Sequence, residues 1–484
     1  MTESRTNLGW GALLDLPVDL PGSGAKHDRL TRALRAAVRS GRLPTDSALP
    51  PSRALAADLG CSRWVVTQAY AQLVAEGYLD ARVGSATRVR WTPDTAHTTP
   101  KFDPAPPAPT RFDLTPGLPD LRAFPRARWG DAVREQTRRI SVPDLGFPPP
   151  GGHPRLRQVL AEHLHRCRGA AADPDDVMIS TGVTDGAARL FRALRTEGIT
   201  RIAVEDPGWP RLHQAAREAG LTIVAIPVDE HGMRVADLDH DPTIRAVLTT
   251  PAHQFPTGVT LTPQRRAALV NWARRADGLV IEDDYDSEFR YDHRPLGAIQ
   301  GMCPQRVALL GSVSKTLSPA LGIGWLLAPP RWCRLLLASG TARSGPPVID
   351  QLAFAQLIRT GGYDRHLRSV RQRYRTRRAA LLTALRTQLP TCEITGSAAG
   401  LHVLAHLEAS ADAAEIVTAA RPLGLRLVDL RTYQIDHRET ANCLVLGYGN
   451  LADSVINDAV AVLATAAKDR GGASGTGHRG GRRG

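Results

Sequence analysis

The spacing of apolar residues before residue 90 predicts three short helices. In the first, the apolar positions follow the i, i+3, i+4, i+7, i+8 spacing of one buried helical face: Leu30, Ala33, Leu34, Ala37 and Val38. A second helix is predicted from a Ser52 cap to Gly60, and a third from a Ser62 cap to Gly77. The inward positions of these two are Leu55, Ala56, Leu59, Val66, Ala69, Tyr70 and Leu73. Two helices joined by a glycine turn are typical of a helix-turn-helix, whose second helix enters the major groove.

The residues after Gly77 predict a two-stranded wing. Two short β-rich runs lie between Ala81 and Val89, separated by the turn-forming pair Gly84-Ser85. The sequence therefore predicts a winged helix-turn-helix over residues 26–91, preceded by an extension of residues 1–25.

Beyond residue 110, short β-rich runs alternate with amphipathic helical segments. The β-rich runs are Val177–Ser180, Arg201–Val204, Thr222–Ile226, Ala246–Thr249, Leu279–Glu282, Val307–Leu310 and Ile323–Leu327. Helical spacing fills Thr184–Thr196 and Pro263–Ala276. This alternation predicts an α/β domain over residues 111–467 with a mixed, mostly parallel sheet wrapped by helices. Its last part, from about Tyr363 to Ala467, opens with a long Arg-rich helix and predicts a smaller α+β lobe.

Two compositional breaks separate the predicted parts of the chain. Residues 92–110 carry six prolines and little to bury, which predicts an extended, semi-rigid linker. The tail, placed at residues 468–484, is rich in Gly and Arg from Gly471 on, and we expect it to be disordered.

Composition excludes several classes of protein. With 484 residues, 42% of them hydrophobic and 23% charged, the chain is not disordered as a whole. Its six cysteines are scattered without a C-x-x-C pair, which predicts reduced thiols in a cytoplasmic protein, with neither a metal site nor a disulfide framework. No apolar run is long enough to cross a bilayer, and the first 25 residues lack the pattern of a secretory signal.

The predicted winged helix is strongly basic, which makes DNA its expected partner. Residues 26–90 contain eleven Lys and Arg but five acidic residues, within a chain of net charge +13. Charge alone is equally compatible with a protein–protein adaptor that has a solvated Arg face. The string LPPSRALAADLGCSRWVVTQAYAQLVAEGYLDARVGSATRV, however, resembles the winged helix-turn-helix of GntR-type bacterial regulators. This resemblance implies DNA contacts from Arg53, Ser62, Arg63 and Thr67, with Arg82 and Gly84 in the wing. Trp64 and Gln68, on the same helix as Arg63, are further candidates for contacts with base edges.

Four segments of the large domain carry candidate chemistry. Gly311-Ser312-Val313-Ser314-Lys315-Thr316 follows a strand, and Ile281-Glu282-Asp283-Asp284-Tyr285-Asp286 sets carboxylates at the end of another. Thr250–Gly258, read as TPAHQFPTG, is a polar turn after a strand. Ser180–Gly186 places small residues at a helix start, where backbone N–H groups can bind phosphate.

In this order the four segments resemble pyridoxal-phosphate enzymes of aminotransferase fold type I. The resemblance implies that Lys315 holds the aldehyde cofactor as a Schiff base and that Asp283 keeps the pyridine nitrogen protonated. It also implies that Tyr285 donates to the ring hydroxyl and that Trp209 stacks on the ring, although an isolated Trp is more often a core residue. The remaining implied cofactor contacts are Val183, Thr184, Asp185, Ser312 and Ser314 at the phosphate, and His253 or Gln254 at the polar edge of the ring. Asp284 and Asp286 are interpreted as helix-start or surface carboxylates.

The combination of the two domains resembles the MocR family of bacterial regulators over residues 26–467. The resemblance implies a head-to-tail homodimer that binds DNA and uses pyridoxal phosphate as effector or as part of an effector sensor.

This sequence departs from the family pattern at three places. Gly322 stands where relatives carry an Arg for the cofactor phosphate, and Arg343 is a candidate to compensate. The segment 145–150 lacks the Tyr that a partner subunit supplies to that phosphate. The C-terminal substrate-binding Arg is missing, which leaves Arg211 as the candidate for an acidic amino-compound effector.

These departures leave three hypotheses. The first is a transcriptional regulator that holds pyridoxal phosphate, with at most vestigial transaminase activity because its substrate clamp is missing. The second is a genuine aminotransferase with a DNA-binding extension. The third is a regulator whose large domain has lost the cofactor and serves only to dimerise.

Overall fold

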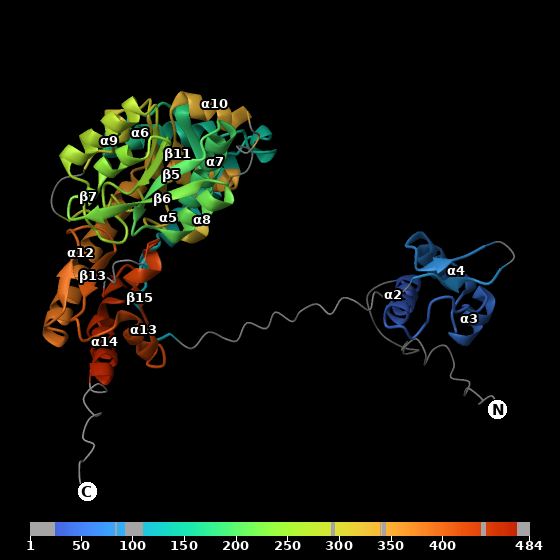
Figure 1. Cartoon of the computed structure of the whole chain (residues 1–484). Helices are drawn as coiled ribbons and strands as arrows, with labels where there is room; N and C mark the ends of the chain where they lie inside the picture. The colour runs from blue at the N-terminus through green and yellow to red at the C-terminus, as the bar shows by residue number, and fades with distance from the viewer. Residues whose placement is uncertain are drawn as a thin grey trace, which may run out of the picture. The chain divides into compact units, whose positions relative to one another are not determined.

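The chain divides into two compact units, Met1–Ala105 and Pro106–Gly484, which are described separately. The computed structural model describes residues 25–82, 85–91, 110–291, 296–338, 340, 345–436 and 442–471, and the side chains of the last helix as far as residue 468 (Figure 1).

In its described residues the first unit contains three helices that pack around one apolar core. They are α2 (Lys26–Arg39), α3 (Ser52–Asp58) and α4 (Arg63–Ala75). Leu34, Leu55, Val66 and Leu73 are fully buried between them, as the helical spacing predicted. Gly60 and Gly77 follow α3 and α4 with positive φ angles, the conformation that favours glycine after a helix.

The helix starts and the wing differ from the sequence prediction in detail. Pro51 holds the cap position of α3, so the predicted Ser52 cap is wrong, and Ser52 is the first helical residue. Ser62 does precede α4, but its side chain makes no capping hydrogen bond. The wing strands are β1 (Leu79–Asp80) and β2 (Arg88–Val89), paired antiparallel, so the first strand begins before Ala81. Gly84 lies outside the described residues.

The second unit contains an eight-stranded sheet in the order β4-β11-β10-β9-β8-β5-β6-β7. Its strands are β4 (Val177–Ser180), β5 (Arg201–Asp206), β6 (Thr222–Asp229), β7 (Gly232–Met233), β8 (Ala246–Thr249), β9 (Leu279–Asp283), β10 (Val307–Ser312) and β11 (Gly324–Leu327). The pairs β10–β9, β9–β8, β8–β5 and β5–β6 are parallel, and the pairs involving β11 and β7 are antiparallel. The predicted mixed, mostly parallel sheet is confirmed.

Helices cover both faces of this sheet because alternate strand residues point to opposite faces and both sets are apolar. Met178 and Leu310 belong to one core cluster, whereas their neighbours Ile179 and Leu309 belong to another. The covering helices are α5 (Arg126–Arg139), α6 (Pro154–Arg168), α7 (Val183–Thr196), α8 (Pro210–Glu218), α9 (Pro263–Arg275), α10 (Pro330–Ala338) and α11 (Val348–Arg359).

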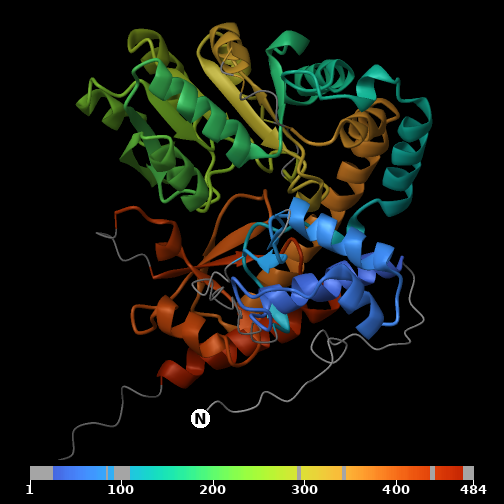
Figure 2. The same cartoon turned by 90° about the vertical axis from the view of Figure 1, so that its right-hand side faces the viewer.

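The predicted α+β lobe lies beneath the sheet domain, as the orange and red segments show in Figure 1 and again in Figure 2. Its antiparallel sheet has the order β12-β13-β16-β15. Its elements are β12 (Glu393–Thr395), β13 (His402–His406), α13 (Ala413–Ala420), β14 (Leu425–Arg426), β15 (Val428–Asp429), β16 (Cys443–Gly447) and α14 (Ile456–Gly471). The strand β14 pairs with β3 (Phe112–Asp113), so the beginning of the unit is part of the lobe. Because α14 extends to Gly471, the predicted start of the disordered tail at residue 468 lies inside a helix.

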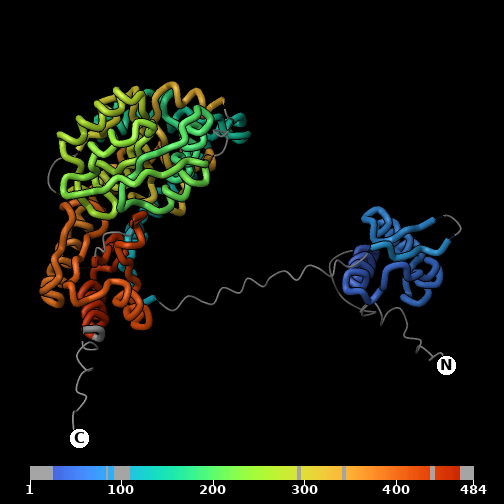
Figure 3. Tube along the Cα trace, in the orientation of Figure 1, coloured from blue at the N-terminus to red at the C-terminus, as the bar shows by residue number. Residues whose placement is uncertain are grey.

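The long helix α12 (Gly362–Gln388) connects the two parts of this unit, as its path in the trace shows (Figure 3). Near its start, the Tyr363 hydroxyl donates to Thr316 Oγ1 over 2.9 Å, and His366 Nε2 lies 2.7 Å from Thr316 O. Further along, Arg377 pairs with the buried Asp120 at 2.7 Å. The helix is therefore bonded near one end to the residue after Lys315 and, further along, to the segment between β3 of the lobe and α5.

Among the described residues, no helix combines the length and the hydrophobicity that crossing a membrane requires.

Candidate functional site

A cavity of about 310 Å³ lies at the carboxyl edge of the large sheet, where α/β folds place their ligands. The strands β4, β9 and β10 end at this edge, and the segments that follow them supply much of the lining. The cavity is lined by Gly117, Thr181, Gly182, Val183, Thr184, Asp185, Trp209, Arg211, Phe255, Asp283, Tyr285, Ser312, Ser314, Lys315, Pro319, Leu401 and His402. The four sequence segments that carried candidate chemistry thus meet in one place.

Lys315 reaches this cavity from the loop after β10. Its Nζ donates a hydrogen bond to Gly117 O and lies 5.9 Å from the centroid of the Trp209 ring. Burial lowers the pKa of the Lys315 amine, because the charged form loses its hydration. A lowered pKa increases the share of neutral amine, which is the form that attacks a carbonyl.

Asp283 faces the same cavity from the last position of β9. Its side chain is 6% exposed, and its Oδ1 has no hydrogen-bond partner among the described residues. Burial raises the pKa of this carboxyl to about 8. A buried carboxyl group with an unpartnered oxygen is suited to a ligand that brings an N–H group or a positive charge.

The buried carboxyl of Asp283 makes the stability of the ligand-free chain depend on pH. Because the folded-state pKa is raised, the folded chain keeps a proton between about pH 4 and 8 that the unfolded chain has released. The contribution of Asp283 to the free energy of unfolding therefore falls as pH rises through that window. We expect Asp283→Asn to raise the free energy of unfolding at pH 8.5 by more than about 1.4 kcal/mol, the value of one pKa unit, and by much less at pH 4.5.

Urea unfolding of the ligand-free protein at the two pH values measures this difference. Asp458→Asn on α14 is the matched control, because its carboxylate is largely exposed and should show no such dependence. An equal effect of Asp283→Asn at both pH values would contradict the raised pKa.

The start of α7 supplies a second polar wall. Val183, Thr184 and Asp185 form the first turn of this helix, where backbone N–H groups lack intrahelical partners and attract anions. The Asp185 carboxylate is already engaged, since it accepts from Thr181 N and pairs with Arg189 at 2.7 Å. Ser312 and Ser314 line the cavity as well. This wall fits a phosphate group held by backbone N–H groups and hydroxyls.

Aromatic rings form a third wall. Trp209 precedes α8 and lies nearly parallel to Tyr433, with ring centroids 6.2 Å apart and an interplanar angle of 21°. Phe255 packs edge-on against Trp209 at 5.1 Å. Trp209 is thus both packed against neighbours and part of the cavity wall, so a flat ligand ring can contact it.

The TPAHQFPTG turn is arranged differently from the sequence interpretation. Neither His253 nor Gln254 lines the cavity, whereas Phe255 does. The Gln254 amide donates to Glu205 and Pro207 O, and its oxygen accepts from Thr257, so it serves the turn itself. His253 lies behind Tyr285, with its Nδ1 3.0 Å from the Tyr285 hydroxyl. In this structure neither side chain lines the cavity, so the ring contact predicted for His253 or Gln254 stays a prediction, and His253 touches the cavity wall through Tyr285.

The two carboxylates interpreted as surface groups are buried or engaged. Asp284 forms a bidentate pair with the buried Arg168, with distances of 2.6 and 3.0 Å. Asp286 is 2% exposed and lies 2.9 Å from His253 Nδ1. The surface interpretation is wrong because partners far away in the sequence, Arg168 on α6 and His253 after β8, fold onto this loop.

Several lining residues were missed from the sequence. Gly117 precedes the first helix of the unit, and Leu401 and His402 come from the small lobe. No local motif marks them, and only the tertiary fold brings them to the cavity. Thr181 and Gly182 lie within the small-residue run Ser180–Gly186 that the sequence analysis recognised, although neither was named as a contact residue.

The positions that depart from the family pattern have distinct surroundings. Gly322 has φ +55°, and a Cβ built there would meet only Thr181 O, at 3.9 Å. Arg211, in the first turn of α8, lines the cavity. Phe147 and Leu145 are exposed. Arg343 lies outside the described residues.

The first unit presents its predicted DNA-binding residues on the surface around the starts of α3 and α4. The exposed Arg63 contacts Ser52 through Nε at 3.3 Å, which joins the two helix starts. Thr67 donates to Arg63 O at 2.9 Å, and Arg82 lies beside Asp80 at 3.4 Å. Trp64 is 59% exposed. The remaining predicted residues in the described part, Arg53, Ser62 and Gln68, are exposed as well.

Comparison with known families matches both units. Residues 26–89 match the family described as bacterial regulatory proteins, gntR family, and residues 122–434 match aminotransferase class I and II. The crystal structure of an archaeal alanine:glyoxylate aminotransferase superposes with a TM-score of 0.69 and 26% identity, covering 74% of this chain and 91% of that one. The fold and the site thus define a winged-helix DNA-binding unit joined to an aminotransferase-type domain.

Two regulators match nearly the whole chain. The HTH-type pyridoxine biosynthesis transcriptional regulator PdxR of Corynebacterium glutamicum is 33% identical over 463 residues, 94% of this chain and 99% of the relative. The probable rhizopine catabolism regulatory protein MocR of Rhizobium meliloti is 31% identical, over 94% of this chain and 95% of its own. The chain belongs to the MocR-type HTH transcriptional regulators, as its sequence pattern predicted.

Proposed function

We propose that this regulator holds pyridoxal phosphate in the Lys315 cavity, acts in the cytoplasm as a head-to-tail homodimer on promoter DNA, and senses pyridoxal phosphate or an amino compound that reacts with it. The observation that carries the proposal is that Lys315 and Asp283 line the same cavity. The buried Oδ1 of Asp283 has no hydrogen-bond partner among the described residues. The name of the relative from Corynebacterium glutamicum, which refers to pyridoxine biosynthesis, supports a vitamin-derived effector.

The residues of the cavity fit this cofactor at each of its functional groups. Lys315 is the amine for the aldehyde, and Asp283 offers an unpartnered oxygen for the ring nitrogen. The first turn of α7 with Ser312 and Ser314 would hold the phosphate, and Tyr285 would donate to the ring hydroxyl. Trp209 offers a flat surface for the ring. When bound, the cofactor supplies an electrophilic carbonyl and an electron-withdrawing ring.

The chain's own residues determine what such a site does. Asp283 would hold or accept a proton beside the ring nitrogen, because burial raises the pKa of its carboxyl to about 8. Lys315, whose lowered pKa leaves more of its amine neutral, would supply the amine that holds the aldehyde and that the amine of an incoming effector would replace. Arg211 lines the same cavity and provides a fixed positive charge, which favours an effector with a carboxylate. Among the described residues that line the cavity Arg211 is the one Arg, and a clamp with a single Arg supports sensing rather than rapid turnover.

DNA binding with and without the cofactor tests the proposal. Genomic fragments captured by the purified full-length protein, sequenced and then used in mobility-shift titrations, should bind with an affinity that falls steeply as salt rises. Adding pyridoxal phosphate should change that affinity and produce a visible absorbance band. If the protein transfers amino groups to a keto acid at enzyme-like rates, the aminotransferase hypothesis is favoured; if no band forms at all, the third hypothesis is favoured.

Restoring the missing phosphate arginine offers a gain-of-function prediction. We expect Gly322→Arg to tighten pyridoxal phosphate binding roughly tenfold. A charge-assisted hydrogen bond contributes about 1.5–3 kcal/mol, and the left-handed backbone at this position offsets about 1 kcal/mol of it. Equilibrium titration of the visible band measures the change. Gly322→Gln is the matched control, because it carries the same backbone strain without the charge, and equal affinities for the two variants would contradict the prediction.

A further inference from the structure

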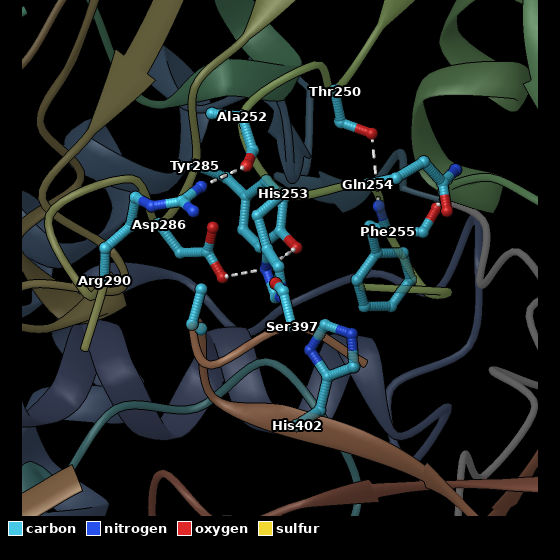
Figure 4. A network of polar contacts seen from close by, with 12 residues as sticks. Thr250, Ala252, His253, Gln254, Phe255, Tyr285, Asp286, Arg290, Ser397 and His402 are labelled. Atoms are coloured by element: carbon cyan, nitrogen blue, oxygen red, sulfur yellow. Dashed lines mark hydrogen bonds and ion pairs between the residues drawn. The ribbon is translucent and has the colours of Figure 1, made fainter. Parts of the chain in front are cut away.

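One ring nitrogen of His253, Nδ1, lies within hydrogen-bonding distance of both Tyr285 and Asp286 (Figure 4). His253 Nδ1 lies 2.9 Å from Asp286 Oδ2 and 3.0 Å from the Tyr285 hydroxyl. Both His253 and Asp286 are 2% exposed, so water does not compete for these contacts. Of the three side chains, Tyr285 alone lines the cavity.

The other ring nitrogen determines where the His253 proton lies. His253 Nε2 is buried and has no hydrogen-bond partner among the described residues. A proton on Nε2 would be a buried donor without an acceptor, and the bare Nδ1 would face the Asp286 carboxylate. A proton on Nδ1 instead meets two acceptors, Asp286 Oδ2 and the Tyr285 oxygen. The geometry therefore favours the tautomer that carries its proton on Nδ1.

This tautomer fixes the direction of the hydrogen bond at Tyr285. When Nδ1 carries the proton, the Tyr285 oxygen accepts from it and cannot donate back. The hydroxyl proton of Tyr285 is then directed to another acceptor: the Asp286 carboxylate, which is also within hydrogen-bonding reach of this hydroxyl, or an oxygen that a ligand brings into the cavity.

We propose that His253 and Asp286 are positioning residues that make the Tyr285 hydroxyl a hydrogen-bond donor to the oxygen on the ligand ring. The proposal rests on the proposed function, because the ring hydroxyl of pyridoxal phosphate, in its anionic form, is the acceptor that this donor would meet. Asp286 accepts from Nδ1 and so keeps the proton on that nitrogen of His253. Nδ1–H then donates to the Tyr285 oxygen, and the Tyr285 hydroxyl donates to the ligand.

The backbone at Gly400 packs directly against His253 and Asp286, with no space for a side chain at that position. Gly400 has φ +69°, and a Cβ built there would lie 2.1 Å from His253 Cε1 and 2.7 Å from Asp286 Oδ2. The titratable and charged groups facing His253 from the surrounding elements are Tyr285, Asp286 and Arg290 after β9 and His402 on β13, with Lys315 across the cavity. Burial lowers the pKa of His402 to about 3, so His402 adds no charge to the network at neutral pH.

The tautomer can be measured without any ligand. In the full-length protein labelled with ¹⁵N-histidine, the nitrogen chemical shifts distinguish the protonated from the bare ring nitrogen, and the His253 signal is identified by its loss in His253→Asn. We expect the proton on Nδ1. A proton on Nε2 in the folded protein at neutral pH overturns the proposal.

The effect on the ligand is measured by the pH midpoint at which the visible band of bound pyridoxal phosphate changes. A hydrogen-bond donor to the ring oxygen stabilises the negative charge on that oxygen. The charge then attracts the proton of the neighbouring imine less strongly, so the pKa of the imine is lower with the donor than without it. We therefore expect His253→Ala to raise the midpoint by about one pH unit, a tenfold change in proton affinity. His253→Asn keeps an N–H group near the position of Nδ1, so it should restore most of the original midpoint.

A double-mutant comparison separates positioning from a general disturbance. If His253 acts through Tyr285, His253→Ala should cause no further rise once Tyr285→Phe is present. An equal rise in both backgrounds, or none in either, overturns the proposal. If the unchanged protein forms no visible band, the proposed function fails, and the tautomer measurement still decides the direction of the hydrogen bond.

Discussion

Lys315→Ala should eliminate the visible absorbance band of added pyridoxal phosphate at every cofactor concentration. The band requires a covalent bond between the aldehyde and an amine, and in the described part of the chain Lys315 is the lysine that reaches the cavity. The chain has only four lysines, Lys26, Lys101, Lys315 and Lys468, so little background from other amines is expected. Absorbance titration of the purified full-length variant measures the effect.

The control for this experiment is Lys26→Ala, which removes a lysine from the first unit and should leave the band unchanged. DNA binding measured without the cofactor should be the same for both variants. A band of normal intensity in Lys315→Ala would mean that the cofactor is held elsewhere, and the site assignment would be lost with it.

Arg63→Ala is expected to abolish the mobility shift of promoter DNA under conditions where the unchanged protein binds fully. Arg63 starts α4, is exposed, and lies beside the start of α3 through its contact with Ser52. A charge-assisted hydrogen bond to a phosphate contributes about 1.5–3 kcal/mol to binding. Its loss corresponds to roughly a 10- to 100-fold lower affinity for each winged helix bound. In a dimer with two bound heads, the two losses combine.

The specificity of this effect can be checked with a matched variant. Arg32→Ala removes the same charge from the exposed side of α2, and we expect a much smaller loss. The visible band of bound cofactor should be intact in Arg63→Ala, because Arg63 belongs to the other unit. Loss of both DNA binding and the band would show that the variant is misfolded or that the site is wrongly assigned.

The sequence predicted those features that depend on local pattern. The β-rich runs Val177–Ser180 and Ala246–Thr249 coincide with β4 and β8, because consecutive apolar residues are expected where helices cover both faces of a sheet. The helix α12 begins within one residue of its predicted start, because its apolar positions recur at helical spacing. Lys315, Asp283 and the start of α7 meet because strands of the same direction end at one edge.

The features that were missed depend on distant partners. Asp284 and Asp286 occupy a loop whose local sequence is compatible with exposure, and Arg168 and His253 bury or engage them. Gln254 stands in a recognisable motif, yet Glu205, on a different strand, uses its amide. A motif can thus identify the loop that forms a site without identifying which of its side chains face the ligand.

The bonding of α12 has a mechanical consequence. Thr316, which follows Lys315 directly, holds the first turns of this 27-residue helix through Tyr363 and His366, and Arg377 further along holds Asp120. At about 1.5 Å per residue the helix is roughly 40 Å long, so it forms one continuous, rigid connection between the loop that carries Lys315 and the small lobe.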